Sequence, residues 1–298
     1  MKEFLRFASN LRFGVPTVCD GASRSQAVGR LFQERRGTLS KRLIAFLALV
    51  TAVALFLISC NPSLTPTPIP STSTPVPSST PVPSATLEPV KAVKVSFVTA
   101  DGVKVSGTLY TGEEQDDIAV VLTHMGQPGT DQTSWTSFAQ HAARQGFSSL
   151  TFNFREDRSR LDFDVRAAVG FLRDQGFQRI VCMGASMGGT ACLKAAVDTD
   201  LAGIVIISSL STTGTGSSGG ALVVNRRELA HITIPKLFIT TQYDDNGVPF
   251  TMKSLYEAAP EPKAFKMFPG SVHGTDIFST PQGDEFRDLL VDFLEKLR

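Results

Sequence analysis

The arrangement of apolar and polar residues changes along this chain, and from residue 91 onward it alternates between two periods. Short apolar runs alternate with stretches in which apolar residues recur every three or four positions, a pattern that predicts strands alternating with amphipathic helices. The run from Ile118 to Thr123 is apolar almost throughout, as expected of a strand buried on both faces of a sheet. Further strands are predicted at 148–154, 180–183, 201–208, 236–241 and 264–268.

Helical stretches lie between these strands. One helix is indicated by apolar residues at i, i+3, i+4 and i+7, namely Trp135, Phe138, Ala139 and Ala142. Others are predicted around 165–172, 190–197 and 286–297, and an antiparallel hairpin is predicted at 93–111, with its turn at Asp101-Gly102. A hairpin followed by repeated β-α units predicts an α/β fold with a mostly parallel sheet and helices on both faces.

The first 60 residues have a different pattern. Residues 1–42 contain nine Lys or Arg against three acidic residues, and the 17 residues of 43–59 contain no charge. A basic flank before a short apolar run predicts a secretory signal. Because ~17 residues is the lower limit for spanning a bilayer, an uncleaved membrane anchor is the alternative. The run ends at Leu57-Ile58-Ser59-Cys60, which resembles the lipobox of bacterial lipoproteins, and this resemblance implies that Cys60 is lipidated and becomes the new N-terminus.

Residues 61–90 predict a disordered tether between this segment and the folded domain at 91–298. Nine of the 30 residues are proline and Ser or Thr fills most of the gaps, so the segment cannot bury enough apolar surface to fold. In extended polyproline form, at ~3.1 Å per residue, it spans up to roughly 90 Å. With either N-terminal alternative, we expect the domain to lie outside the cytoplasm and to be held at a membrane.

Charge and cysteine content exclude several functions. The whole chain carries a net charge of +1 and its basic excess lies at the N-terminus, so the domain has no predicted nucleic-acid-binding face. No C-x-x-C or His/Cys cluster predicts a metal site. Cys182 and Cys192 are expected to be buried but unpaired, because structural disulfides usually staple small, loop-rich folds.

The segment from Gly184 to Gly188 has the form G-x-S-x-G, which makes physical sense at a tight strand-to-helix turn. Such a turn exposes the hydroxyl of Ser186, and the two glycines let the strand and helix pass closely. A serine hydroxyl is a poor nucleophile until a base removes its proton, and the base in turn needs a group that fixes its tautomer. Ser186 is therefore a candidate nucleophile, provided that the chain supplies both partners.

His273 is the predicted base, because it follows the last predicted strand in a loop. Of the other histidines, His141 is expected on a helix surface, His231 in a polar segment, and His124 at the end of a strand as a loop-shaping residue. The acid is expected in the turn after the strand at 236–241. Asp245 is preferred, because the run D-x-x-V-P resembles the acid loop of many serine hydrolases, with Asp244 as the alternative.

The order Ser, Asp, His after successive strands resembles the α/β-hydrolase superfamily, in particular its dienelactone-hydrolase and small-esterase members, over nearly all of 91–298. The resemblance implies an oxyanion hole made by the backbone N–H groups of Met187 and of Met125, although Met125 stands where this family often has glycine. It also implies that no cofactor or metal is needed. Arg155 matches part of a further family segment, either as a structural ion pair or as a substrate contact.

The polar segment between Ser208 and Leu229 is too short for a cap domain, and we expect it to be a surface loop over a compact site. Taken together, the sequence predicts a membrane-tethered serine esterase that acts on a small-molecule ester. A peptidase or amidase of the same fold remains an alternative, because a Ser-His-Asp triad does not discriminate ester from amide. A non-catalytic surface-binding lipoprotein is the alternative of a different class.

Overall fold

The computed structural model describes residues 89–112, 117–215, 219–245 and 247–298. The predicted signal segment, Cys60 and residues 61–88 of the predicted tether lie outside this part of the chain. Within the described ranges, no helix is both long enough and apolar enough to cross a bilayer.

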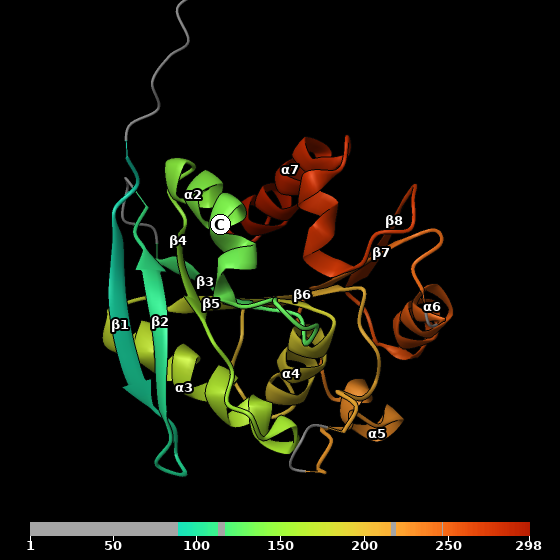
Figure 1. The fold of residues 1–298 in the computed structure, drawn as a ribbon, viewed down its shortest axis with the longest axis horizontal. Helices are drawn as coiled ribbons and strands as arrows, with labels where there is room; N and C mark the ends of the chain where they lie inside the picture. The colour runs from blue at the N-terminus through green and yellow to red at the C-terminus, as the bar shows by residue number, and fades with distance from the viewer. Residues whose placement is uncertain (1–88, 113–116, 216–218, 246) are drawn as a thin grey trace, which may run out of the picture. The chain divides into compact units, whose positions relative to one another are not determined.

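An eight-stranded sheet forms the centre of the fold, in the order β1-β2-β4-β3-β5-β6-β7-β8 (Figure 1). The pairs β1–β2 and β2–β4 are antiparallel, and all pairs from β4 through β3 to β8 are parallel. The strands are β1 (Ala92–Val98), β2 (Lys104–Tyr110), β3 (Ile118–Thr123), β4 (Ser148–Phe152), β5 (Arg179–Ala185), β6 (Gly203–Ile207), β7 (Lys236–Thr241) and β8 (Lys263–Phe268). The mostly parallel sheet predicted from the sequence is confirmed.

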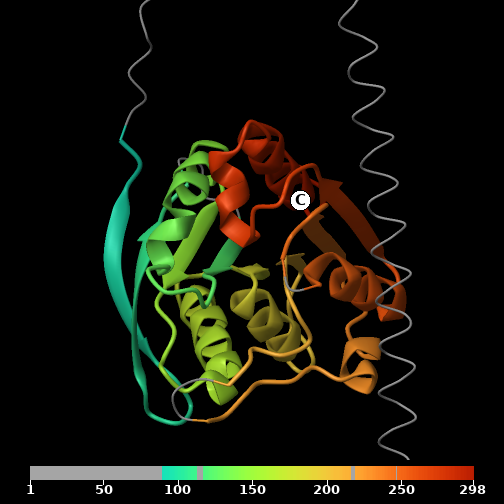
Figure 2. The same ribbon diagram turned by 45° about the vertical axis from the view of Figure 1, so that its right-hand side comes forward.

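Helices cover both faces of the sheet, as Figures 1 and 2 show. On one face lie α2 (Thr136–Arg144) and α7 (Gly283–Glu295), whose apolar residues share a buried core with alternate residues of the central strands. The other face carries α3 (Leu161–Asp174), α4 (Met187–Ala195), the short α5 (Arg226–Ala230) and α6 (Val248–Ala258). Because β3, β4, β5, β6 and β7 are buried along nearly their whole length, their residues read as continuous apolar runs.

Helix α6 and a disulfide are among the features that differ from the sequence-based expectation. Helix α6 was not predicted, because the residues before it indicate a turn; Gly247 forms its N-cap with φ of 69°, and Pro249 lies in its first turn. Cys182 and Cys192 form a disulfide, with their Cα atoms 5.8 Å apart. The expectation of two unpaired cysteines is therefore wrong, because packing of α4 against β5 brings two side chains from neighbouring elements together.

Candidate active site

Ser186 lies at a sharp turn between β5 and α4. Its backbone has φ of 52° and ψ of −118°, in the left-handed half of conformational space that a non-glycine residue rarely occupies. Glycines make this turn possible, since a Cβ on Gly184 would lie 2.5 Å from the carbonyl carbon of Gly188. A Cβ on Gly188 would lie 2.5 Å from the carbonyl oxygen of Thr123, at the end of β3. Strand, turn and helix therefore pack backbone to backbone, and the half-buried Ser186 side chain lies at the carboxyl end of the sheet.

Met187 begins α4 directly after the serine. Met125 lies two residues after the end of β3, the strand next to β5. In the described part of the chain, neither backbone N–H has a hydrogen-bond acceptor. A Cβ on Gly126 would lie 2.8 Å from Met187 Sδ, so the two segments are in contact. Two unpaired amides on touching segments beside a serine are suited to binding a negatively charged oxygen.

The side chain of Met125 has a packing role that glycine could not fill. It is fully buried, and its Cγ and Sδ occupy the space next to Gly274, where a Cβ would lie 3.1 Å from Met125 Cγ. Gly274 has φ of 56° and directly follows His273. Met125 therefore packs against the loop that carries His273.

His273 and Asp244 form a hydrogen-bonded pair, with 2.7 Å between His273 Nδ1 and Asp244 Oδ1. The side chain of Asp244 is 1% exposed and that of His273 is 19% exposed. Their loops are joined by bonds from Thr241 Oγ1 to the carbonyl of Val272, at 2.8 Å, and from the Tyr243 amide to the carbonyl of Gly270, at 2.9 Å. The carboxylate accepts the Nδ1 hydrogen, so the neutral ring has its lone pair on Nε2.

The carboxylate bonded to His273 is that of Asp244 and not that of Asp245, which the sequence favoured. Asp245 is exposed, and its carbonyl accepts a hydrogen bond from the amide of Val248 at the start of α6. The two aspartates point in different directions because the chain turns between β7 and α6. Only Asp244 reaches the histidine, which is the alternative that the sequence left open.

A cavity of about 280 Å³ contains both Ser186 and His273. No hydrogen bond joins their side chains in the described part of the chain, where the His273 side chain is bonded to Asp244. The remaining residues that line the cavity come from five segments: Gly126, Gln127, Arg158, Met187, Leu210, Thr212, Thr213, Gly214 and Val248. The polar segment expected to be a surface loop thus contributes Thr212 to Gly214 to the cavity wall. A second cavity of about 470 Å³ adjoins this one through Gly126, Gln127, Arg158 and Met187.

His124 holds the loop that carries Met125. Its Nδ1 lies 2.6 Å from the carbonyl oxygen of Met125, and its Nε2 accepts a hydrogen bond from the amide of Phe154 at 3.2 Å. Burial lowers the pKa of His124, so the neutral ring with hydrogen on Nδ1 satisfies both contacts. The predicted loop-shaping role agrees with this geometry.

Two arginines near the site have different partners. Arg155 is 6% exposed and binds Asp164, at 2.7 Å, and Asp101, at 2.6 Å, so the ion-pair alternative describes its contacts. The hydrogen bonds from Arg155 and Thr99 to Asp101 hold the pKa of that carboxyl far below its usual range. Arg158 instead donates from Nη2 to the carbonyl of Gly126 at 3.0 Å and lines both cavities. Nothing in the sequence indicated Arg158, because its position depends on a short turn, Arg158–Arg160, before α3.

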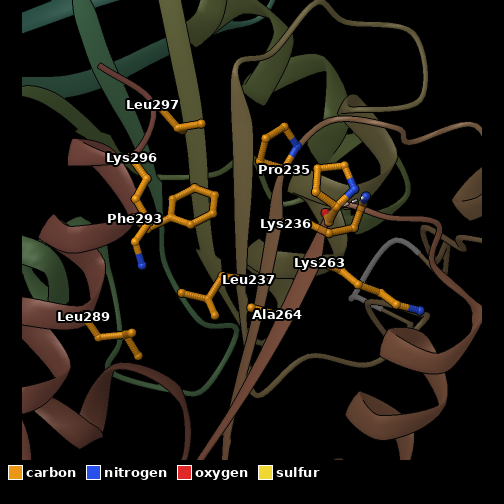
Figure 3. Close-up of a pocket in the computed structure, with 10 residues that line it drawn as sticks. Pro235, Lys236, Leu237, Lys263, Ala264, Leu289, Phe293, Lys296 and Leu297 are labelled. Atoms are coloured by element: carbon orange, nitrogen blue, oxygen red, sulfur yellow. Dashed lines mark hydrogen bonds between the residues drawn. The ribbon is translucent and has the colours of Figure 1, made fainter.

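A separate cavity of about 320 Å³ lies at the amino ends of β7 and β8, against α7 (Figure 3). Its apolar wall is formed by Leu237, by Leu289 and Phe293 of α7, and by Leu297 just after that helix; the last three are only partly buried. The amine of Lys236 donates to the carbonyls of Pro260, at 2.8 Å, and Pro262, at 3.3 Å. Burial lowers the pKa of Lys236 to about 8. This cavity contains no residue of the Ser186 site.

No known family model matches the sequence, and a comparison with curated proteins finds no match. Solved structures do match the fold. Dienelactone hydrolase from Anabaena variabilis superposes with a TM-score of 0.57 at 19% identity, covering 70% of this chain and 98% of that one. An esterase from Pyrococcus furiosus gives 0.56 at 17% identity, covering 70% and 93%. The acylaminoacyl peptidase of Pyrococcus horikoshii gives 0.57 at 16% identity, covering 70% of this chain and 42% of the peptidase. At these identities the likeness shows the fold, which is that of the α/β hydrolases.

Proposed function

We propose that this protein is a serine hydrolase that cleaves small carboxylic esters through an acyl-enzyme intermediate. The observation that carries the proposal is a single constellation. Ser186 lies on a strained turn, in one cavity with His273, whose Nδ1 is bonded to the buried Asp244. A structural role does not require a serine with positive φ to share a cavity with a histidine that is bonded to a buried carboxylate, nor two unpaired amides to lie on touching segments beside that serine.

In the acylation step, Ser186 Oγ attacks the ester carbonyl carbon while His273 Nε2 takes the hydroxyl proton. The bond from Nδ1 to Asp244 fixes the tautomer and stabilises the imidazolium that forms. The carbonyl oxygen becomes negatively charged and is bound by the N–H groups of Met125 and Met187. Each such donor contributes about 2.7–4 kcal/mol to lowering the barrier. Collapse of the tetrahedral intermediate expels the alcohol, which takes the proton from His273.

Deacylation repeats these roles with water as the nucleophile. His273 accepts a proton from water, hydroxide adds to the acyl carbon, and the ester bond to Ser186 breaks to release the carboxylic acid. The proton then returns from the imidazolium to Ser186 Oγ, so the enzyme ends in its starting state. No further group is required to balance the reaction.

The size of the site favours small substrates. At about 280 Å³, the cavity lies just below the range of roughly 300–1,000 Å³ that is usual for small-molecule sites. The adjoining cavity of about 470 Å³ has the charged residues Arg155, Glu156 and Arg158 in its wall, so it does not extend the apolar surface. Leu210 and Val248 supply apolar surface, while Thr212, Thr213 and the backbone of Gly214 add polar groups. A short acyl group fits such a space, whereas a long acyl chain requires an extended apolar groove.

We also propose, from the sequence alone, that the enzyme is tethered outside the cytoplasmic membrane through lipid on Cys60. Growth of a bacterial expression host on labelled palmitate tests this proposal. We expect label in the full chain and none in the Cys60→Ala variant. Label in both proteins, or in neither, contradicts the lipoprotein proposal.

Hydrolysis of p-nitrophenyl esters with graded acyl chains, compared with matched p-nitroanilides, tests the proposed reaction. We expect turnover of the acetate and butyrate esters, a decline with longer chains, and loss of at least about 10³-fold in kcat for Ser186→Ala. Ser96→Ala is the matched control, because Ser96 is exposed on the edge strand β1. Equal activity in the Ser186 variant refutes the mechanism, and faster anilide turnover identifies an amidase instead.

A further inference from the structure

The disulfide between Cys182 and Cys192 joins the two elements that meet at Ser186. Cys182 belongs to β5 and Cys192 to α4, ten positions apart, with the serine between them. Both cysteines are fully buried in the core cluster beneath the helix. The bond therefore closes a covalent loop that includes the Ser186 turn, and neither cysteine lines the cavity.

Helix α4 needs support from outside its own sequence. It has only nine residues, and two of its first three are Gly188 and Gly189, which disfavour helix because they lose the most backbone freedom. Both glycines are required by packing, since a Cβ at either position would collide with Thr123 or Ser209. The N-cap residue is Ser186 itself, and its side chain makes no capping hydrogen bond. Because the Ser186 side chain does not cap α4, the covalent bond to β5 gives the start of the helix a support that its own sequence lacks.

The disulfide also touches the strand that leads to the second amide. Thr123 Oγ1 lies 3.4 Å from Cys192 Sγ and donates to the carbonyl of Met183 at 3.3 Å. Thr123 is the last residue of β3, and Met125 follows it by two positions. One buried contact therefore connects the helix that carries the Met187 amide to the strand end that carries the Met125 amide.

We propose that Cys182 and Cys192 are positioning residues, whose disulfide holds Ser186 and the two oxyanion amides in register. This inference rests on the proposed function of Ser186. The bond does not contact substrate, so its effect falls on the rate of acylation rather than on substrate binding. A displacement of about 1 Å at a reacting group costs on the order of 10²-fold in rate. We therefore expect opening the bond to slow acylation by roughly 10- to 100-fold.

The test uses the full chain in detergent and a fluorophosphonate probe, with the rate of Ser186 labelling as the readout. Tris(2-carboxyethyl)phosphine donates two electrons to the disulfide and becomes its phosphine oxide, taking oxygen from water, while the sulfurs become two thiols. Alkylation and peptide mass spectrometry report whether positions 182 and 192 are open. Oxidised glutathione then restores the bond and yields two reduced glutathiones. We expect labelling to slow on reduction and to recover on reoxidation, and kcat for p-nitrophenyl acetate to fall with KM nearly unchanged.

The Cys182→Ala/Cys192→Ala variant cannot form the disulfide, so it gives a second form of the protein without the bond. It also controls for effects of the reductant at other sites. At a temperature where circular dichroism shows the variant to be folded, we expect the fluorophosphonate to label its Ser186 at the slow rate. Adding phosphine should not change that rate. The proposal is overturned if opened wild-type protein, or the folded variant, labels as fast as the oxidised protein. It is also overturned if positions 182 and 192 alkylate before reduction, because then no bond exists. Failure of the oxidised protein to label at Ser186 refutes the proposed function itself.

Discussion

Replacing Asp244 by asparagine separates two neighbouring carboxylates that the sequence could not distinguish. Asparagine has nearly the same shape as aspartate, but it removes the charge beside His273 Nδ1, 2.7 Å from Oδ1. Asp245→Asn is the matched control, because it makes the same chemical change at an exposed side chain one residue away.

The expected magnitude follows from the charge that develops during the reaction. When His273 takes the serine proton, the imidazolium faces the Asp244 carboxylate, whose side chain is 1% exposed. With about 4 Å between the charge centres and an effective permittivity of about 20, the attraction is roughly 4 kcal/mol. Because about 1.36 kcal/mol corresponds to a tenfold change in rate, kcat should fall by about 10³-fold. A wrongly held tautomer increases the loss toward about 10⁴-fold.

The assay is p-nitrophenyl acetate hydrolysis, with the concentration of active sites determined by titration and folding checked by circular dichroism. We expect Asp244→Asn to lose about 10³-fold in kcat and Asp245→Asn to stay within about twofold, since an exposed charge is screened by solvent. The assignment is refuted if Asp245→Asn shows the large loss, or if folded Asp244→Asn retains wild-type kcat.

Two further predictions concern stability. Gly188→Ala should lower the free energy of unfolding by about 1–3 kcal/mol, because its Cβ would lie 2.5 Å from the Thr123 carbonyl oxygen. Gly170 lies on an open stretch of α3, where a Cβ would have no neighbour outside its own helix segment within 4 Å. Gly170→Ala should therefore raise the free energy of unfolding by about 0.5–1 kcal/mol. Urea denaturation measures both, and equal effects at the two sites contradict the packing argument. Because the pKa of Lys236 is lowered to about 8 from 10.5, the folded state binds fewer protons than the unfolded state between these values. The free energy of unfolding should therefore rise with pH in this window, by at most about 1.4 kcal/mol per pH unit, and the slope should be smaller in Lys236→Met; parallel curves for the two proteins contradict it.

Much of the fold could be predicted from the sequence because buried parallel strands have a strong local signal. The predicted bounds of β3 and β7 coincide with the observed ones, since both strands are fully buried and end at polar turns. The tight strand-to-helix turn at Ser186 was also predictable, because the close packing of strand and helix requires glycines around it. These features depend on residues adjacent in sequence.

The remaining features depend on how side chains point and how helices pack in the folded chain, which the local sequence does not determine. Asp244 and Asp245 are chemically identical, and only the path of the chain between β7 and α6 decides which one is buried. The disulfide depends on how α4 packs on β5. The cavity wall combines Arg158 with Thr213, 55 positions later, through a hydrogen bond from Thr213 Oγ1 to the Arg158 carbonyl. Such a contact is a property of the folded chain and has no sequence pattern.

The central claim is that Ser186 is the activated nucleophile, and covalent labelling tests it most directly. The full chain is incubated with a fluorophosphonate, and the adduct is counted by intact mass and located by peptide mass spectrometry. We predict one adduct per folded chain, on Ser186, absent from Ser186→Ala and strongly slowed in Asp244→Asn. A folded protein that acquires no adduct, or that acquires it on another residue, contradicts the account.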